Sequence, residues 1–178
     1  MQEVLDHKAY KFLEELQKKY DGKIEIDYVI LKINNGNSCI DIHKKAAIKA
    51  IEILSEREKW KSVNLKIQED KMKGLNYSPK NLLGNDKTDY ANAFLFSPYS
   101  TGLMIEDFYK LNNILFSNID NLEIYDWCGD REVWGDKYWK YNWSNYFDFG
   151  LEWWGIYFWT IYDKETDLYI VISASATD

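Results

Sequence analysis

The chain has 178 residues, 46% of them apolar and 29% charged, which is the composition of one globular domain (residues 1–178) with a sizeable core. Disordered and fibrous proteins are therefore excluded, and the longest apolar run, near 155–162, is too short to span a bilayer. The first residues carry charges throughout, without the apolar core of a secretory signal, and there are only two cysteines, so we expect a cytoplasmic protein with free thiols.

The first half of the chain predicts helices and strands in alternation. Apolar residues at three- and four-residue spacing, among them Leu5, Phe12 and Leu16, predict a helix over 3–20. The patterns that follow predict a strand at 23–33, a turn at 34–38, a helix at 41–60 and a strand at 62–68. Residues 69–90 are rich in Gly, Pro, Asn, Asp and Lys, which favours a long loop with little regular structure.

The second half predicts a sheet that ends in a hairpin. The expected elements are a strand at 91–97, a helix at 102–116, a strand at 122–127, an aromatic loop at 129–150, and strands at 152–162 and 168–174. The run at 153–162 is apolar on both faces, which indicates a central strand. The order of elements predicts an α+β fold: a mixed or mostly antiparallel sheet, about three helices packed on one face, and a C-terminal β-hairpin.

Few residues of the chain suit catalysis or metal binding. Only two histidines are present; His7 is expected on the solvent side of the first helix, and His43 near the start of the second. Cys39 and His43 have a spacing that two metal ligands could use, but two ligands do not make a zinc site, and Cys128 is the only further thiol. We therefore expect neither a metal nor a cofactor, and no enzymatic activity.

Aromatic residues concentrate in one stretch of the chain. Of the eight tryptophans, seven lie between Trp127 and Trp159, and acidic residues are interleaved with them. Tryptophan dominates the centres of protein interfaces, and surrounding carboxylates would orient a basic partner, so this stretch predicts a partner-binding face. The residues predicted to form it are Asp126, Trp127, Asp130, Glu132, Trp134, Asp136, Trp139 and Trp143.

Two other interpretations of the same stretch stay open. The carboxylates Asp148 and Glu152 lie amid aromatic residues, and such a pair beside stacked tryptophans would suit a carbohydrate-binding or glycoside-processing protein. Alternatively, the aromatic side chains form core, and the function lies elsewhere, for example in the 69–90 loop.

The charge of the chain is distributed unevenly and limits the choice of partner. Residues 1–90 contain 17 Lys and Arg against 15 Asp and Glu, a net charge of +2, whereas residues 91–178 contain 5 against 14, a net charge of −9. Such an acidic half would repel phosphates, so we expect neither nucleic acid nor an anionic membrane as partner. The same field would attract a basic protein surface.

In general character the chain resembles bacterial immunity proteins, the small cytoplasmic inhibitors encoded beside secreted toxins. The shared features are modest size, acidic charge, aromatic richness, a mixed α and β pattern, and the lack of a catalytic set. The resemblance implies a cytoplasmic binding protein that inhibits a basic toxin domain, such as a nuclease, by covering it with the acidic, tryptophan-rich face.

Overall fold

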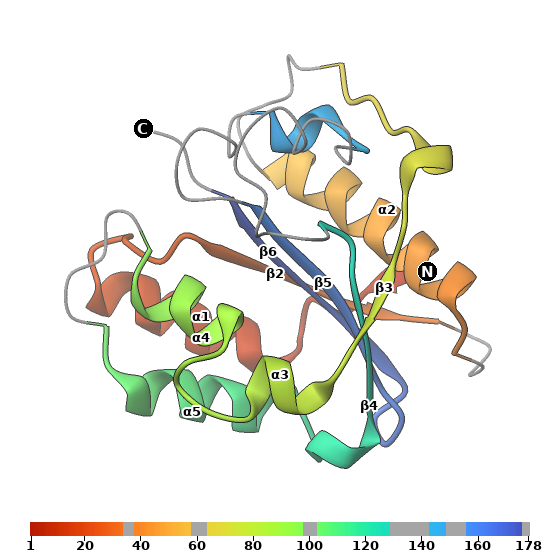
Figure 1. The fold of residues 1–178 in the computed structure, drawn as a ribbon. Helices are drawn as coiled ribbons and strands as arrows, with labels where there is room; N and C mark the ends of the chain where they lie inside the picture. Colours follow the sequence, from red (N-terminus) through yellow and green to blue (C-terminus); the bar gives the residue numbers. More distant parts are fainter. Residues whose placement is uncertain (34–37, 58–63, 98–102, 129–142, 149–155, 176–178) are drawn as a thin grey trace.

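We describe a computed structural model of the chain, for all residues except 34–37, 58–63, 98–102, 129–142, 149–155 and 176–178. One antiparallel sheet of six strands, in the order β1-β2-β6-β5-β4-β3, forms its centre (Figure 1). The strands are β1 (Gln2–Glu3), β2 (Ile26–Lys32), β3 (Leu75–Tyr77), β4 (Leu122–Asp126), β5 (Ile156–Asp163) and β6 (Leu168–Ser175). The helices are α1 (Lys8–Lys19), α2 (Ile40–Arg57), α3 (Pro79–Leu83), α4 (Asp89–Leu95) and α5 (Ile105–Leu115), with 3-10 turns η1 (Glu69–Lys71), η2 (Ile119–Asn121) and η4 (Asn145–Phe147). The predicted α+β class is confirmed.

Helices cover both faces of the sheet, which corrects the expectation of helices on one face. α1, α3, α4 and α5 lie on one side, whereas α2 lies alone on the other (Figure 1). Because successive side chains of a strand point to opposite faces, Tyr28 and Ile30 of β2 join the core with α1, and Val29 and Leu31 join the core with α2. The sheet is therefore apolar on both of its faces.

The predicted C-terminal hairpin is confirmed and occupies the middle of the sheet. β5 pairs with β6 from Ile156 to Asp163, and the outer edges of these two strands pair with β4 and β2. Asp163 is fully buried at the end of β5, where its carboxylate accepts hydrogen bonds from the Ser117 backbone N–H (2.9 Å) and hydroxyl (2.8 Å). These bonds fasten the hairpin to the chain that follows α5.

One predicted strand, at 91–97, is a helix. α4 is capped at its start by the Thr88 hydroxyl, which accepts a hydrogen bond of 3.2 Å from the N–H of Ala91. Every residue from Tyr90 to Leu95 except Asn92 is buried, so the helix has only a short polar stripe of Asp89 and Asn92. A short apolar run with so few polar positions gives no clear period by which a helix differs from a strand.

Other predicted boundaries also differ. The described part of 62–68 contains no strand, only a bridge between Ile67 and Ser144. The expected loop at 69–90 contains η1, β3, α3 and the start of α4. The first helix begins at Lys8 rather than residue 3, because β1 precedes it and the His7 ring caps it, Nδ1 accepting from the N–H of Ala9 (3.3 Å). The predicted turn at 34–38 and most of the aromatic loop lie outside the described residues.

None of the helices in the described ranges is long and apolar enough to cross a lipid bilayer.

Candidate functional site

The structure places the described residues of the predicted partner-binding face in the core. Asp126, Trp127 and Trp143 have exposed fractions of 3%, 2% and 1%. The two tryptophans pack in the core between α2 and the sheet, where the Trp143 ring meets those of Phe147 and Phe158 edge to face. They follow the alternative interpretation, in which these rings are core. The remaining residues of the predicted face lie outside the described ranges: Asp130, Glu132, Trp134, Asp136 and Trp139.

A hydrogen bond joins the two buried tryptophans. The indole Nε1 of Trp143 donates to the carbonyl of Trp127 over 2.9 Å, and the carbonyl of Trp143 accepts from the N–H of Gln68 over 2.7 Å. Gly74 lies so close to the Trp127 ring that a Cβ atom there would stand 2.9 Å from Cη2. The two described tryptophans that stand two residues before and directly after the segment 129–142 are therefore bonded to each other in the core.

A chain of buried polar groups continues from Trp127 to α2. Its indole Nε1 donates to the hydroxyl of Thr160 over 2.8 Å, and the same hydroxyl lies 2.8 Å from Nδ1 of His43. Nε2 of His43 lies 3.1 Å from the Ser38 hydroxyl and 4.0 Å from a carboxylate oxygen of Glu123. Burial lowers the pKa of His43 to about 4, so the ring is neutral near pH 7.

The order Ser38, His43, Thr160 has the hydrogen-bond reach of a nucleophile, a base and an orienting group. The position of the ring proton of His43 argues against nucleophilic catalysis by Ser38. A Thr160 hydroxyl that accepts from the indole of Trp127 still has its own proton to donate to Nδ1, and in that tautomer the single ring proton of the neutral His43 lies on Nε2. A protonated Nε2 points at Ser38 and Glu123 as a donor and cannot accept the serine proton. We interpret the chain as a structural link between α2 and the sheet.

The alternative carboxylate pair is not brought together by any described contact. Asp148 is exposed at the end of η4, and Glu152 lies outside the described residues. Within the part of the chain that the structure describes, no group of three His, Cys, Asp or Glu side chains could hold a metal ion. Cys39 is exposed and Cys128 half-buried, and neither forms a disulfide.

A groove that the sequence did not indicate lies between α1 and β2. Its volume is about 520 Å³, and it is lined by apolar and polar side chains from three separate parts of the chain. Leu5, Leu13 and Ile26 supply apolar surface, and Arg57 reaches it from the last residue of α2. Since these residues are distant in sequence, no local pattern joins them. The sequence pattern that bears on this groove is the apolar spacing of α1, which predicts that helix but not the groove beside it.

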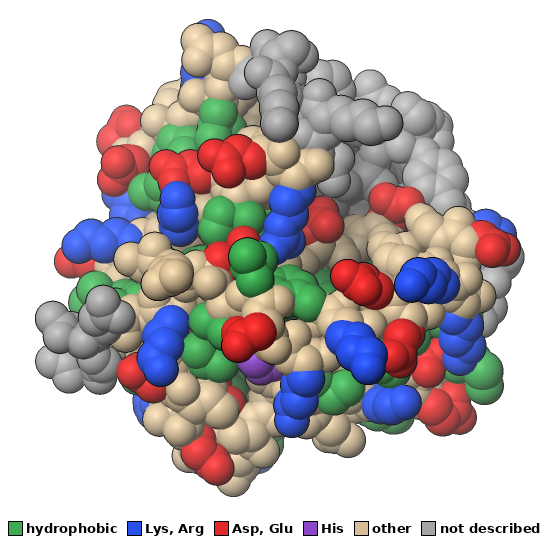
Figure 2. Space-filling model, turned by 180° about the vertical axis from the view of Figure 1, so that it is seen from behind, with side chains coloured by type: hydrophobic (Ala, Val, Ile, Leu, Met, Phe, Trp, Pro, Cys, Tyr) green, Lys and Arg blue, Asp and Glu red, His purple; other side chains and the backbone are tan. Residues whose placement is uncertain are grey.

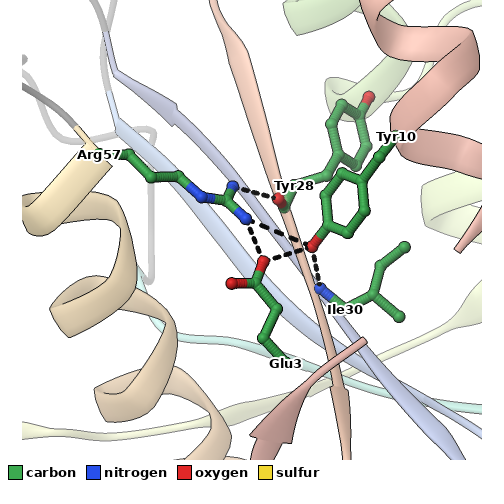
Figure 3. A network of polar contacts seen from close by, with 5 residues as sticks. All are labelled: Glu3, Tyr10, Tyr28, Ile30 and Arg57. Atoms are coloured by element: carbon green, nitrogen blue, oxygen red, sulfur yellow. Dashed lines mark hydrogen bonds and ion pairs between the residues drawn. The ribbon is translucent and has the colours of Figure 1, made fainter. Parts of the chain in front are cut away.

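Three residues of the groove lining, Tyr10, Tyr28 and Arg57, belong to a polar network with Glu3 and Ile30 (Figure 3). The Tyr10 hydroxyl donates to Glu3 over 2.6 Å and accepts from the N–H of Ile30 over 2.9 Å. Arg57 donates to the carbonyl of Tyr28 over 3.0 Å and forms an ion pair with Glu3. Burial, with the hydrogen bond to Glu3, raises the pKa of Tyr10 to about 12. β1 has only two residues and leaves part of the edge of β2 without a neighbouring strand. There the side chains of Tyr10 and Arg57 bond backbone groups of β2 that a longer β1 would have paired.

Comparison with known proteins gives no match: no family model, curated protein or solved structure is significantly similar to the chain.

Proposed function

We propose that the chain is a binding protein that inhibits a basic protein partner, such as a toxin nuclease, in the manner of bacterial immunity proteins. The observation that carries the proposal is the hydrogen bond between Trp143 and the carbonyl of Trp127. It joins the described residues on either side of the segment 129–142, and that segment contains Asp130, Glu132 and Asp136 together with two tryptophans. Binding segments held at both ends by a packed core are a common way to present contact residues.

Charge supports the same proposal. The net charge of −9 in residues 91–178 would speed encounter with a cationic surface. On the face drawn in Figure 2, Lys and Arg side chains are interleaved with Asp and Glu, so that face offers no large field of one sign. The acids of segment 129–142 lie among tryptophans in the sequence, and we assign the electrostatic attraction to them.

The test begins with the partner. The tagged chain is purified from its source organism, the co-purifying protein is identified, and its affinity is measured by calorimetry at low and high salt. The triple variant Asp130→Asn, Glu132→Gln and Asp136→Asn should weaken binding at least about tenfold at low salt, because three charge pairs of the interface are lost. Inhibition of the partner's activity should fall in parallel.

The control variant removes the same charge elsewhere. Asp21→Asn, Asp86→Asn and Asp120→Asn neutralise three exposed acids outside the segment 129–142. These changes should leave the affinity within about twofold, since only a weak long-range field is reduced. Equal losses in both triple variants, or an affinity independent of salt, would contradict the proposal.

A further inference from the structure

The outer edge of β2 is only partly paired. Successive residues of a strand in an antiparallel sheet direct their backbone groups to opposite sides. Ile30 directs its groups away from β6, since its C=O accepts from the N–H of Val4 over 2.9 Å. By this alternation Tyr28 and Ile26 do the same, and the bond from Arg57 to the C=O of Tyr28 confirms it for Tyr28. The backbone groups of these residues therefore form the edge that follows β1.

Other parts of the chain bond this edge on both sides of a gap. At one end, Gln17 donates from Nε2 to the C=O of Ile24 over 2.9 Å. At the other end, Arg57 donates to the C=O of Tyr28 over 3.0 Å (Figure 3). Between them, the N–H and C=O of Ile26 and the N–H of Tyr28 bond no group of the described residues. A donor, an acceptor and a second donor are thus open in a row.

The groove between α1 and β2 follows this open part of the edge. Ile26 and Tyr28 direct their side chains to the face of the sheet that α1 covers, whereas Asp27, between them, faces the other side. Arg57, from α2 on that other side, also lines the groove. Residues of both faces line one groove because it lies at the edge of the sheet. The Arg57 side chain is 37% exposed while it bonds the C=O of Tyr28, so the edge can be reached from solvent.

The lining of the groove suits an uncharged occupant with hydrogen-bonding groups in a row. Two acidic and two basic residues line it, so it carries no net charge. Leu13 adds apolar surface, and Leu5 has an exposed fraction of 72% at the rim. An extended polypeptide has the complementary groups: two residues with one between them present C=O, N–H and C=O in a row, in whichever direction the segment runs. Its apolar side chains would cover the leucines.

A second copy of the chain is a poorer occupant of the same edge. Each copy offers two open donors, the N–H groups of Ile26 and Tyr28, and one open acceptor, the C=O of Ile26. Two such edges side by side would hold four donors for two acceptors, and an N–H without an acceptor is costly at an interface. The edge therefore fits a segment that offers two acceptors and one donor.

We infer that the open edge of β2, at residues 26–28, binds an extended, apolar segment of a partner protein, which joins the sheet in line with β1. The N–H groups of Ile26 and Tyr28 donate to two carbonyls of the segment, and the C=O of Ile26 accepts one N–H. Apolar side chains of the segment pack against Leu5 and Leu13. The inference does not depend on the proposed function, since it needs neither a basic partner nor the acids of the segment 129–142.

The test uses a short peptide and its N-methylated form. The ¹⁵N-labelled full chain is titrated with acetyl-Thr-Val-Thr-Val-Thr-Val-amide and, separately, with the same peptide N-methylated on its two central residues. Because adjacent residues direct their N–H groups to opposite sides, the two methyl groups obstruct both edges of the peptide. The unmodified peptide should shift the amides of Ile26 and Tyr28 with a dissociation constant on the order of 1 mM. It should also slow hydrogen exchange of these amides at least about threefold at saturation, since both become bonded.

The methylated peptide and two variants locate the contact. N-methylation should weaken binding at least about tenfold, because it removes a backbone bond and obstructs the pairing. Leu5→Ser removes apolar surface at the rim and should weaken the unmodified peptide at least about threefold. Leu75→Ser is the matched control: Leu75 is also exposed, but it lies in β3 at the opposite edge of the sheet, and its change should alter binding less than about twofold. Both variants fold, since each leucine is exposed.

Three outcomes would overturn the inference. Equal binding of the two peptides would show that the backbone groups of the edge are not used. Shifts confined to Asn76 and its neighbours would place the peptide on β3. Shifts of Ile26 and Tyr28 that depend on protein concentration without peptide, together with a dimer in sedimentation velocity, would identify a second copy as the occupant. Since neither peptide is charged, none of these outcomes decides the salt-dependent binding of the proposed function.

Discussion

The indole of Trp143 donates a hydrogen bond of 2.9 Å to the carbonyl of Trp127, and both residues are almost completely buried. The bond links the chain that leaves β4 to the chain that precedes η4, across the segment 129–142. The rings of both residues pack in the same core as the side chains of α2. The pair of tryptophans therefore contributes to the stability of the core between α2 and the sheet.

Replacing Trp143 should test the structural role of this pair. Trp143→Phe removes the indole donor, leaves the Trp127 carbonyl without its partner and creates a small cavity, so we expect a loss of about 2–4 kcal/mol in the free energy of unfolding. Urea denaturation at neutral pH measures it. Phe96→Leu alters an exposed aromatic residue and should change the free energy by less than about 0.5 kcal/mol. Similar effects of both changes would show that the Trp143 bond adds nothing.

Gly74 should be needed for the position of the Trp127 ring. Gly74→Ala places a methyl group 2.9 Å from Cη2 of that ring, so either the ring or the backbone must move, at a cost of about 1–3 kcal/mol. Tryptophan fluorescence and near-ultraviolet circular dichroism should change with it. Gly22→Ala is the contrast: it strains a residue with φ of 73° but meets no atom within 4 Å, so it should lower stability without altering the tryptophan signals.

His43 should make the stability of the protein fall in mild acid. Burial depresses its pKa from 6.5 to about 4, so between these values the unfolded state takes up a proton that the folded state does not. The contribution of His43 is complete above pH 6.5 and decreases as the pH falls, by about 3 kcal/mol at pH 4. Urea denaturation from pH 7 to pH 4 measures the slope.

The control for this slope is the protein without an ionisable group at position 43. His43→Gln should show a clearly shallower loss of stability over the same pH range, whatever its stability at pH 7. His7→Gln should keep most of the slope, since His7 is partly exposed, although burial lowers its pKa in the same direction. Parallel slopes for the wild type and His43→Gln would show that His43 takes up its proton equally in the folded and unfolded states, which contradicts the prediction.

The predictable part of the fold follows from periodicity. The apolar spacing of α1 and α5 and the two-sided apolar character of β5 are local patterns, and each marked an element correctly. α4 was predicted as a strand because almost all its residues are buried and apolar, which leaves too few polar positions to show a helical period. α2 was found as a helix, but the face of the sheet it covers depends on chain path, which local patterns do not encode.

The candidate site was less predictable, because composition does not distinguish exposed from buried aromatic residues. Trp127 and Trp143 are typical interface residues by type, yet each has its N–H bonded within the protein. The groove depends on Gln17, Ile26 and Arg57, which meet only after the sheet has formed. Nothing in the sequence around Gln17 predicts that its side-chain oxygen will be buried.

The network of Glu3, Tyr10 and Arg57 should couple the N-terminus to the end of α2. Tyr10→Phe removes the acceptor for the N–H of Ile30 and the donor to Glu3, and should cost about 1–2 kcal/mol in the free energy of unfolding. Glu3→Gln weakens the ion pair with Arg57, a partly exposed pair that contributes less than about 1 kcal/mol.

The double variant decides whether these residues act together. Because Tyr10 and Arg57 share one carboxylate oxygen of Glu3, the combined loss in Glu3→Gln with Tyr10→Phe should differ from the sum of the single losses by at least about 0.5 kcal/mol. Lys49→Gln combined with Tyr10→Phe is the matched control, since Lys49 pairs with Glu52 on α2 and not with this network. Additive losses in both pairs of variants would mean that Tyr10 and Glu3 stabilise the edge of β2 independently.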